Sequence, residues 1–305
     1  MTFEVKILGS TSAVAQHGRH PTSQLVNIHD KYFLVDCGEG TQMRMNDFKV
    51  KRFKINHIFI SHLHGDHYYG LIGVITTFQL LQRLEPLTIY GPPLLEEIIQ
   101  LQLRAGGTQL NYPLLFVKTQ DNHQELLFSD ADVEVYSFPL QHRIPTTGFL
   151  FIEKSTQRRI NGEKTNGLTL LPKDFIDLKE GRDITLSDGS FFKNDSLTLP
   201  PYPSRRYAFC SDTKFLPELK SIIEGVDLLY HEATFMNDAE KRANDTYHST
   251  TGQAATLAEM AGVKHLIVGH FSSKYIELNF HLDEVRQVFP NSDLATEGTT
   301  FKVLR

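Results

Sequence analysis

The chain of 305 residues lacks several features that would place it in a class at once. It has no tryptophan and two cysteines, Cys37 and Cys210, which excludes a disulfide framework of the secreted kind. No apolar run approaches the ~20 residues that cross a bilayer. The N-terminal residues alternate charged with apolar side chains, where a signal peptide would need an apolar core. We therefore expect a cytoplasmic protein that contacts no membrane.

Positive charge is also scarce. Lysine and arginine number 31 against 36 aspartate and glutamate residues, for a formal net charge of −5. The global positive field that is typical of nucleic-acid binding is therefore absent. Histidine is abundant by contrast, with 14 copies. Because histidine is the commonest metal ligand and acid–base group, the positions of these residues decide what the count means.

Strand and helix patterns alternate along the chain. Hydrophobic residues make up 40% and charged residues 22%, an ordinary globular composition that excludes whole-chain disorder or a collagen-like fibre. Short apolar runs predict strands at residues 5–8, 32–35, 57–60, 87–90, 133–138, 148–152, 207–210, 227–230 and 266–268. Helical patterns lie at residues 69–84, 94–104, 216–224, 251–261 and 282–289. The alternation indicates an α/β or mixed layered architecture, in one large domain or two small ones.

One stretch interrupts this alternation. Residues 153–199 are polar, carry Asn-Gly and Asp-Gly turn signals, and contain few apolar runs. We expect a long loop here, and a connection this long in a compact domain is usually functional or disordered. Composition leaves two interpretations open, a surface insertion without a binding role and an arm that contacts the substrate.

The most informative segment has the pattern His-x-His-x-Asp-His and comprises His62, His64, Asp66 and His67. It directly follows a buried strand pattern and precedes a helix. The first two histidines can point to one side of an extended turn, while Asp66 and His67 face a second position nearby. Imidazole nitrogens with a carboxylate are the ligands that zinc prefers. A solvated histidine-rich turn is the alternative, and the restrictive spacing argues against it.

Further ligand candidates follow other predicted strands, namely His142, Asp212 and His270. Ligands in α/β sheets gather at the carboxyl ends of strands, so these side chains are expected near the motif. Together they supply five histidines and two aspartates, which suits two metal ions that share one bridging carboxylate. Such a pair activates a hydroxide for attack on phosphorus or on a carbonyl carbon.

With these residues the sequence resembles the metallo-β-lactamase superfamily, and within it the ribonuclease Z family of tRNA 3′-processing endonucleases. The motifs that carry the closer resemblance lie at residues 9–12, 35–42, 211–213, 231–235, 248–250 and 270–275. The resemblance implies a metallo-β-lactamase-like four-layer α/β/β/α sandwich. Residues 1–305 would form a single metallo-hydrolase domain, with an inserted substrate-binding arm at 153–199, and two chains would form a homodimer.

The resemblance also implies a role for each candidate ligand. One zinc ion would be held by His62, His64 and His142, the other by Asp66, His67 and His270, and Asp212 would bridge them. Asp66 would in addition orient or deprotonate the attacking water. Asp36, at the end of its own predicted strand, is a candidate to fix the tautomer of a ligand histidine from outside.

His248 and Glu232 form a second constellation. The oxygen released when a phosphodiester is cut must be protonated, and a histidinium positioned by a carboxylate suits that step. From the residues alone, His248 is better interpreted as a surface histidine ahead of a helix capped by Ser249. The family resemblance favours the catalytic role, and it leaves His231 as a structural residue.

RNA requires local positive charge even on an acidic chain. Residues 44–54 carry five cations and one acid, interleaved with aromatic residues, although a solvated basic face is common without RNA. The arm is a second candidate through Arg158, Arg159 and Lys164. It departs from family arms, because Leu170-Leu171-Pro172 stands where a Gly-Pro element with more lysines is expected.

The sequence therefore predicts a hydrolase, an endoribonuclease with two zinc ions (Zn2+) per subunit. It would remove the 3′ trailer from precursor tRNA by attack of a metal-activated water, with His248 protonating the leaving oxygen, and so leave a tRNA 3′-hydroxyl. Two alternatives stay open. One is a di-zinc hydrolase of small phosphodiesters, sulfates or thioesters, and the other is an RNA-binding module with a structural metal site.

Overall fold

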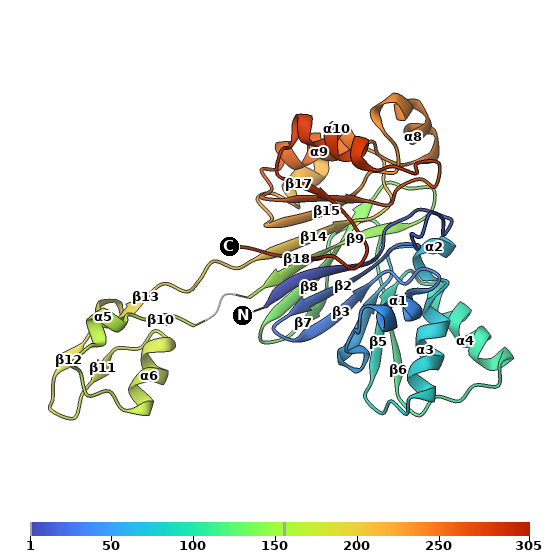
Figure 1. Ribbon diagram of the computed structural model, residues 1–305. Coiled ribbons are helices and arrows are strands. Elements are labelled where there is room, and N and C mark those ends of the chain that lie inside the picture. Colours follow the sequence, from blue (N-terminus) through green and yellow to red (C-terminus); the bar gives the residue numbers. More distant parts are fainter. Residues whose placement is uncertain (1, 155–156) are drawn as a thin grey trace. The chain divides into compact units, whose positions relative to one another are not determined.

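The structure is a computed structural model that describes residues 2–154 and 157–305 (Figure 1). Its chain divides into two compact units. The main unit contains the residues up to Ile152 together with Arg205–Leu304, and the arm unit contains Glu153–Ser204 with Arg305. Each unit has a hydrophobic cluster of its own, so each is described separately below.

Two seven-stranded sheets form the centre of the main unit. The first has the order β18-β1-β2-β3-β4-β5-β6, with β1 Phe3–Gly9, β2 Ser23–Ile28, β3 Lys31–Val35, β4 Ile55–Phe59, β5 Leu87–Gly91, β6 Leu114–Lys118 and β18 Thr300–Lys302. The second has the order β17-β16-β15-β14-β9-β8-β7, with β7 Glu125–Ser129, β8 Val133–Leu140, β9 Thr146–Glu153, β14 Arg206–Cys210, β15 Leu228–Glu232, β16 Leu266–Gly269 and β17 Ser292–Leu294. Strands β3 to β6 are parallel to one another, as are β14 to β17.

The central strands are apolar on both faces because both faces are covered. In β9, Phe149 and Phe151 belong to the core between the sheets, whereas Leu150 between them packs on the helix side. The ring centroids of Phe59 and Phe149 lie 5.4 Å apart across the two sheets. Alternation of side chains along a strand therefore explains why these strands appear in the sequence as continuous apolar runs.

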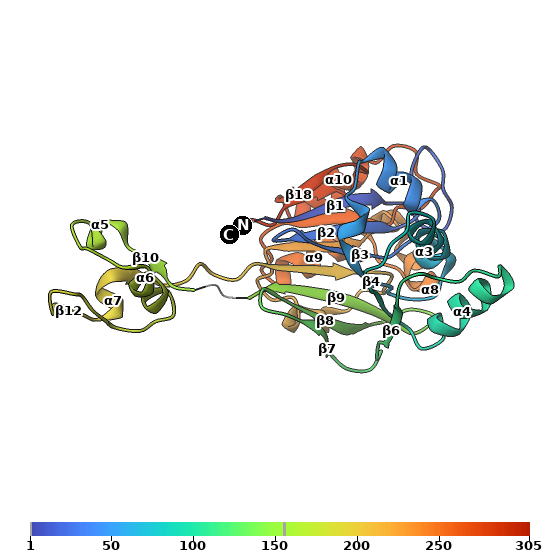
Figure 2. The same ribbon diagram turned by 90° about the horizontal axis from the view of Figure 1, so that it is seen from below.

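Helices cover the outer face of each sheet (Figures 1 and 2). Helices α1 Thr41–Asp47, α3 Leu71–Leu80 and α4 Leu95–Ala105 pack on the first sheet, and α9 Thr251–Met260 and α10 Asn279–Val288 pack on the second. Two further helices, α2 Gly65–Tyr68 and α8 Glu240–Thr246, lie in connections. The result is the predicted four-layer α/β/β/α sandwich.

Each of the nine predicted strands occurs, but several elements differ from the prediction. Of the predicted helix at 69–84, only α3 forms, over Leu71–Leu80. The helix ends there because Gln82 adopts a left-handed backbone with a φ of 58°. The predicted helix at 216–224 is a 3-10 helix, Pro217–Ser221. Strand β2 was not predicted, because it contains polar residues that interrupt an apolar run. These residues are buried in the structure, where for example the Asn27 side chain donates to Glu4 at 3.0 Å.

The arm unit is folded, and the expectation of a long loop there is wrong. It contains β10 Arg159–Ile160, α5 Gly162–Thr165, α6 Pro172–Lys179, β11 Ile184–Thr185, β12 Phe191–Phe192, α7 Asn194–Leu197 and β13 Thr198–Leu199. Its cluster comprises Leu178, Ile184, Leu186 and Leu197. These four apolar residues are scattered singly along the sequence, so no run indicates the core they form.

A contact between two loops holds the histidine motif in place. The Gly70 amide donates to the Cys37 carbonyl at 2.9 Å, and the Cys37 amide donates to the His67 carbonyl at 2.7 Å. A Cβ atom at Gly70 would lie 2.1 Å from the Gly38 carbonyl oxygen, far inside van der Waals contact. Glycine at position 70 therefore allows the loop after β3 to approach the motif.

The substitution Gly70→Ala tests this contact. We expect it to lower the free energy of unfolding by about 2 kcal/mol, because the added methyl group forces the two backbones apart. The matched control is Gly106→Ala, since Gly106 has a φ of −83° and the nearest atom to an added Cβ lies at 3.4 Å. Urea unfolding measures both. Equal stability of the two variants would contradict the prediction.

Candidate metal centre

The predicted ligands come from the carboxyl ends of strands in both sheets. The histidine motif follows β4, His142 follows β8, Asp212 follows β14 and His270 follows β16. Parallel strands place their carboxyl ends at one edge of a sheet, and the two sheets face each other, so segments distant in sequence converge there. The structure brings all seven predicted ligand residues together at this edge.

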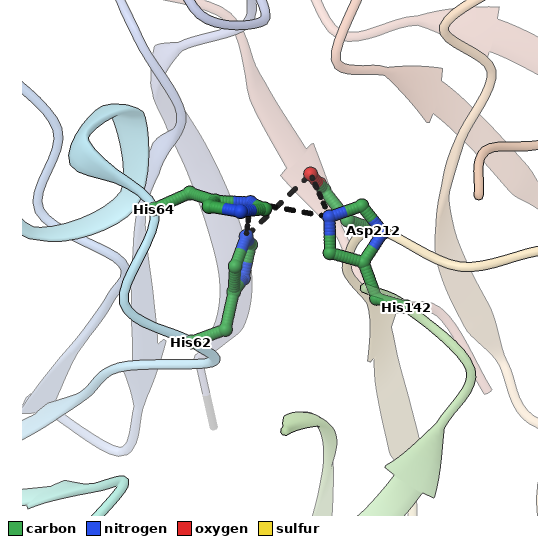
Figure 3. A group of neighbouring side chains, drawn as sticks. All are labelled: His62, His64, His142 and Asp212. Carbon is green, nitrogen blue, oxygen red and sulfur yellow. Dashed lines mark hydrogen bonds and ion pairs between the residues drawn. The ribbon is translucent and has the colours of Figure 1, made fainter. Parts of the chain in front are cut away.

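The first group consists of His62, His64, His142 and Asp212 (Figure 3). The His64 Nδ1 atom lies 3.1 Å from the Nε2 atoms of both other histidines. The Asp212 Oδ2 atom lies 3.6 Å from His62 Nε2 and 3.7 Å from His142 Nε2. Ligand atoms around a tetrahedral zinc ion, at about 2.0–2.1 Å from the metal, are about 3.3 Å apart, so this group has suitable spacing.

The second group consists of Asp66, His67 and His270. The Nε2 atoms of the two histidines lie 3.3 Å apart, and Asp66 Oδ2 lies 3.3 Å from His270 Nε2 and 3.5 Å from His67 Nε2. These distances again suit ligand atoms that surround one cation. The three residues that the family resemblance assigns to a second metal ion thus lie together.

Asp212 faces both groups at once. Its Oδ2 atom points to the first group, and its Oδ1 atom lies 3.3 Å from His67 Nε2 and 3.2 Å from His270 Nε2 of the second. Asp212 is buried, and Oδ1 accepts no hydrogen bond from the residues that the structure describes. A buried carboxylate oxygen without a donor is unfavourable, and a metal ion would satisfy it. The donor set therefore fits divalent cations.

Outer hydrogen bonds fix the tautomers of three ligand histidines. His142 Nδ1 donates to the Tyr247 carbonyl at 2.8 Å, and His67 Nδ1 donates to Asp36 Oδ2 at 2.7 Å. His270 Nδ1 lies 2.8 Å from the Thr234 hydroxyl. With the proton on Nδ1, the lone pair of each Nε2 atom points into the centre, as a metal ligand requires.

Asp36 occupies the outer position that the sequence predicts for it. Besides His67, its carboxylate accepts hydrogen bonds from the Ser61 amide at 2.8 Å and the Ser61 hydroxyl at 2.9 Å. Both Asp36 and His270 have left-handed backbones, with φ values of 54° and 60°. Strain of this kind costs about 1–3 kcal/mol per residue and persists only where surrounding contacts impose it.

Burial and neighbouring charges set the protonation states of the candidate ligands. Burial lowers the pKa of His142 to about 4, so its ring is neutral near pH 7. Burial by itself would raise the pKa of Asp212, but the imidazoles of His270, His67 and His62 outweigh that effect and hold this pKa well below its usual range. His142 and Asp212 are thus in the protonation states that bind metals. Burial by itself would lower the pKa of His67, but Asp212 and the neighbouring carboxylates raise this pKa well above its usual range, so the His67 ring must release a proton when it binds a metal.

His248 and Glu232 lie beside the metal ligands. His248 Nδ1 donates to Glu232 Oε1 at 2.8 Å, and Glu232 is fully buried. Burial by itself would lower the pKa of His248, but the charge and hydrogen bond of Glu232 raise this pKa to about 9. His248 is therefore protonated at neutral pH, and its Nε2 atom makes no hydrogen bond within the described part of the chain.

A cleft of about 520 Å³ opens onto this arrangement, and we call it the metal cleft. Its lining includes Asp66, Asp212, His248 and His270, together with Arg143 and Arg242. His248 also forms a third group of possible metal ligands with Asp212 and His270. Because both partners belong to the groups above, this third group adds only His248 to the candidate ligands.

Sequence reasoning missed several contributors to the centre. The Thr234 hydroxyl donates a hydrogen bond to Glu232 Oε2 at 2.7 Å and accepts one from His270 Nδ1. It therefore links the candidate metal ligands to the His248 and Glu232 pair. Its position two residues after Glu232 is a signal that could have found it. Two backbone groups also contribute, the Tyr247 carbonyl and the Ala13 amide, which donates to Asp66 Oδ2 at 2.7 Å. Because any residue carries these groups, the sequence could not have indicated them.

Two of the five cations in the basic segment 44–54 form ion pairs. Arg44 pairs with Glu297 at 2.9 Å and with Asp47 at 3.0 Å, and Lys54 pairs with Asp30. The segment contributes no residue to the lining of the metal cleft. The positive charge at that cleft comes from Arg143 and Arg242, which the sequence interpretation did not single out. His231 is buried, with Nδ1 2.6 Å from the Glu232 carbonyl, which fits a structural role.

Fold and site together define a metallo-β-lactamase-fold protein with a two-part histidine and aspartate centre. The solved structure of human tRNase Z, short form, matches 99% of this chain and 100% of its own with a TM-score of 0.73 and 25% identity. The metallo-β-lactamase fold protein YhfI from Bacillus subtilis matches with a TM-score of 0.70 at 16% identity, covering 99% of this chain and 100% of its own. A family model described as Anti-Pycsar protein Apyc1 matches residues 3–157.

Curated relatives define the family more closely. A protein named Ribonuclease Z from Phocaeicola vulgatus is 43% identical over 295 residues, which covers 97% of this chain and 96% of the relative. Another of that name, from Cytophaga hutchinsonii, is 43% identical over 305 residues, with 99% and 97% covered. The chain belongs to the ribonuclease Z family.

The substitution Thr234→Val tests the outer support of the metal centre. It replaces a hydroxyl group by a methyl group of similar size, so His270 loses the partner that fixes its tautomer. We expect the affinity for Zn2+ to fall about 10–100-fold, as measured by competition with a chelator. Thr76→Val is the control, because among the described residues the Thr76 hydroxyl bonds only the Ile72 and Gly73 carbonyls in α3. Equal affinities of the two variants would refute this role of Thr234.

Proposed function

We propose that this protein is a metal-dependent endoribonuclease that removes the 3′ trailer from precursor tRNA and leaves a tRNA 3′-hydroxyl. One observation carries the proposal. A seven-ligand histidine and aspartate centre shares a cleft with a histidine that is held by a buried carboxylate, in a chain of the ribonuclease Z family. The name of the human structural relative, tRNase Z, supports tRNA as the substrate.

The metal complement that we propose is two zinc ions per chain. His62, His64 and His142 would hold one ion, Asp66, His67 and His270 the other, and Asp212 would bind both through its two oxygens. Divalent cations in such a pair lower the pKa of a water molecule and offset the charge that develops on the phosphate.

The side chains of the chain supply the proton transfers. Asp66 Oδ2 is held by the Ala13 amide, and Asp66 Oδ1 is left to accept a proton from the attacking water. As the water oxygen bonds to phosphorus, the bond from phosphorus to the ribose 3′ oxygen breaks and its electron pair moves to that oxygen. His248 Nε2 donates the proton that this leaving oxygen needs, and Glu232 stabilises the imidazolium beforehand.

The His248→Ala variant tests this assignment with a trailer-bearing precursor tRNA. We expect metal-loaded wild-type protein to cut just 3′ of the discriminator base. His248→Ala should lower kcat at least ~100-fold, because it lacks the general acid, while its metal content stays at the wild-type value. His265→Ala is the control, since His265 pairs with Asp293 at 2.9 Å. His265 does not line the metal cleft and belongs to neither ligand group.

Two results would contradict the proposal. Loss of a metal ion in His248→Ala would make His248 a ligand instead of an acid. An uncut precursor alongside rapid hydrolysis of a small phosphodiester would favour the alternative of a small-substrate hydrolase. RNA binding without any turnover would favour the binding module.

We further propose that residues 1–305 act as one metallo-hydrolase domain and that 153–199 is its substrate-binding arm. The separate folding of Glu153–Ser204 supports this division. Some arm cations are paired within the unit, as Arg158 is with Asp195 and Arg182 with Asp177. Lys164, Lys173 and Lys193 have no ion pair within the described residues, so they are the arm's candidates for phosphate contacts.

Deletion of residues 153–199, replaced by a short glycine and serine linker, tests the arm. We expect kcat/KM for precursor tRNA to fall at least ~10-fold, because several phosphate contacts are lost. Hydrolysis of bis-p-nitrophenyl phosphate, which is too small to reach an arm, serves as the internal control for a folded centre. Undiminished tRNA cleavage by the deletion variant would refute the arm assignment.

We also propose a cytoplasmic homodimer. The free, buried Cys37 and Cys210 suit a reducing compartment such as the cytoplasm. No helix in the described ranges is long and apolar enough to cross a membrane. Exposed leucines on and after α3 and α4 support self-association, namely Leu80, Leu84 and Leu101, which are 79%, 71% and 60% exposed.

Light scattering tests the oligomeric state. We expect a mass of two chains for the wild type and of one chain for Leu84→Glu, because a charge would be buried in the apolar contact. Leu115→Glu is the matched control, since Leu115 is an exposed leucine on the edge strand β6. A monomeric wild-type protein would overturn the dimer.

A further inference from the structure

A second cleft adjoins the metal cleft and is not used by the chemistry described above. It has a volume of about 670 Å³, and we call it the outer cleft. Its lining includes Gln141, Phe215, Lys241 and Asn244. His248 lines both clefts, so this side chain forms the boundary between them.

The segments that build the outer cleft are those that carry the metal ligands. Gln141 precedes His142, and the backbone amide of Gln141 donates to the Thr213 hydroxyl at 3.1 Å. The Lys214 amide donates to the Gln141 carbonyl at 3.0 Å, two residues after Asp212. The His248 amide donates to the Ala243 carbonyl in α8 at 2.8 Å. A ligand in the outer cleft would thus be positioned by the same backbone that positions the metal ligands.

The direction of the proposed reaction assigns the two clefts to different parts of the RNA. The attacking water and the leaving oxygen lie roughly in line across the phosphorus atom. Asp66, which holds the water, lines the metal cleft and not the outer cleft. His248 protonates the leaving oxygen, which belongs to the nucleotide that the tRNA retains. That nucleotide therefore lies on the far side of His248 from Asp66, which is the side of the outer cleft.

The chemistry of the outer cleft suits a nucleobase. Phe215 is half-buried and packs on the helix-side core of the second sheet, so its ring is a fixed surface for stacking. The side-chain amides of Gln141 and Asn244 make no hydrogen bond within the described residues, and amides pair with base edges. Lys241 lacks an ion pair in the described chain and can meet a phosphate. The volume lies within the range of about 300–1,000 Å³ that is usual for small-ligand sites.

We infer that the outer cleft binds the discriminator nucleotide, the last nucleotide that the tRNA retains, and so determines which precursors are cut fastest. This inference rests on the proposed function. The base stacks on Phe215, and the amides of Gln141 and Asn244 contact its polar edge. The trailer leaves through the metal cleft, on the other side of His248.

Four precursors that differ only in the discriminator base test the inference, together with four that differ only in the first trailer nucleotide. We expect Phe215→Ala to lower kcat/KM about 10-fold or more for all precursors, because it removes the stacking surface. The double variant Gln141→Ala with Asn244→Ala should reduce the spread of kcat/KM among the four discriminator bases at least ~3-fold. Its preference for the first trailer nucleotide should stay unchanged.

Phe280→Ala is the matched control, since Phe280 is an exposed phenylalanine on α10 that lines neither cleft. Thermal unfolding and metal content establish that Phe215→Ala is folded, and the double variant changes only exposed side chains. Two outcomes would overturn the inference, an unchanged spread among discriminator bases and an altered preference confined to the trailer nucleotide. A wild-type protein that cuts no precursor would instead refute the proposed function itself, and this inference with it.

Discussion

Asp212 lies between two groups of imidazoles, and the centre depends on this one buried carboxylate. Its two oxygens face different groups, with Oδ2 near His62 and Oδ1 near His67. A buried charge without partners would be costly, and the surrounding imidazoles are what makes this position tolerable. Since the ligands come from β4, β8, β14 and β16, both sheets must be assembled before the centre exists. The core between the sheets is thus also the support of the site.

Outer contacts convert this cluster into an ordered centre. Asp36 orients His67, the Tyr247 carbonyl orients His142, and the Thr234 hydroxyl orients His270. Thr234 also donates to Glu232, so the carboxylate that positions His248 is joined to a metal-ligand histidine by one hydroxyl group. The Thr234 hydroxyl therefore links the candidate ligand cluster to the His248 and Glu232 pair. The left-handed backbones of Asp36 and His270 show that surrounding contacts hold these residues against local conformational preference.

The net charge of the whole chain does not indicate the positive charge at the two clefts. A net charge of −5 indicates no affinity for RNA, yet Arg143 and Arg242 line the metal cleft, and Lys214 and Lys241 line the outer cleft. In the basic run at 44–54, two of the five cations, Arg44 and Lys54, pair with acidic side chains, and the run does not line the metal cleft. The local arrangement of cationic side chains determines the field that a polyanion meets at this edge. Neither the net charge nor a run of cations predicts it.

The sequence alone determined the ligand types, their spacing in the motif and their positions after apolar runs, because these features are local. It therefore predicted the nine strands and named the seven candidate ligands and the His248 and Glu232 pair that the structure brings to one edge, and the family resemblance supplied the four layers. Only the tertiary structure decided which oxygen of Asp212 faces which group, which hydroxyl and carbonyl groups orient the ligands, and where Arg143 and Arg242 lie. It also decided that residues 159–199 fold around Leu178 and Leu197. These features depend on contacts between residues far apart in the chain, and such contacts leave no periodic signal in the sequence.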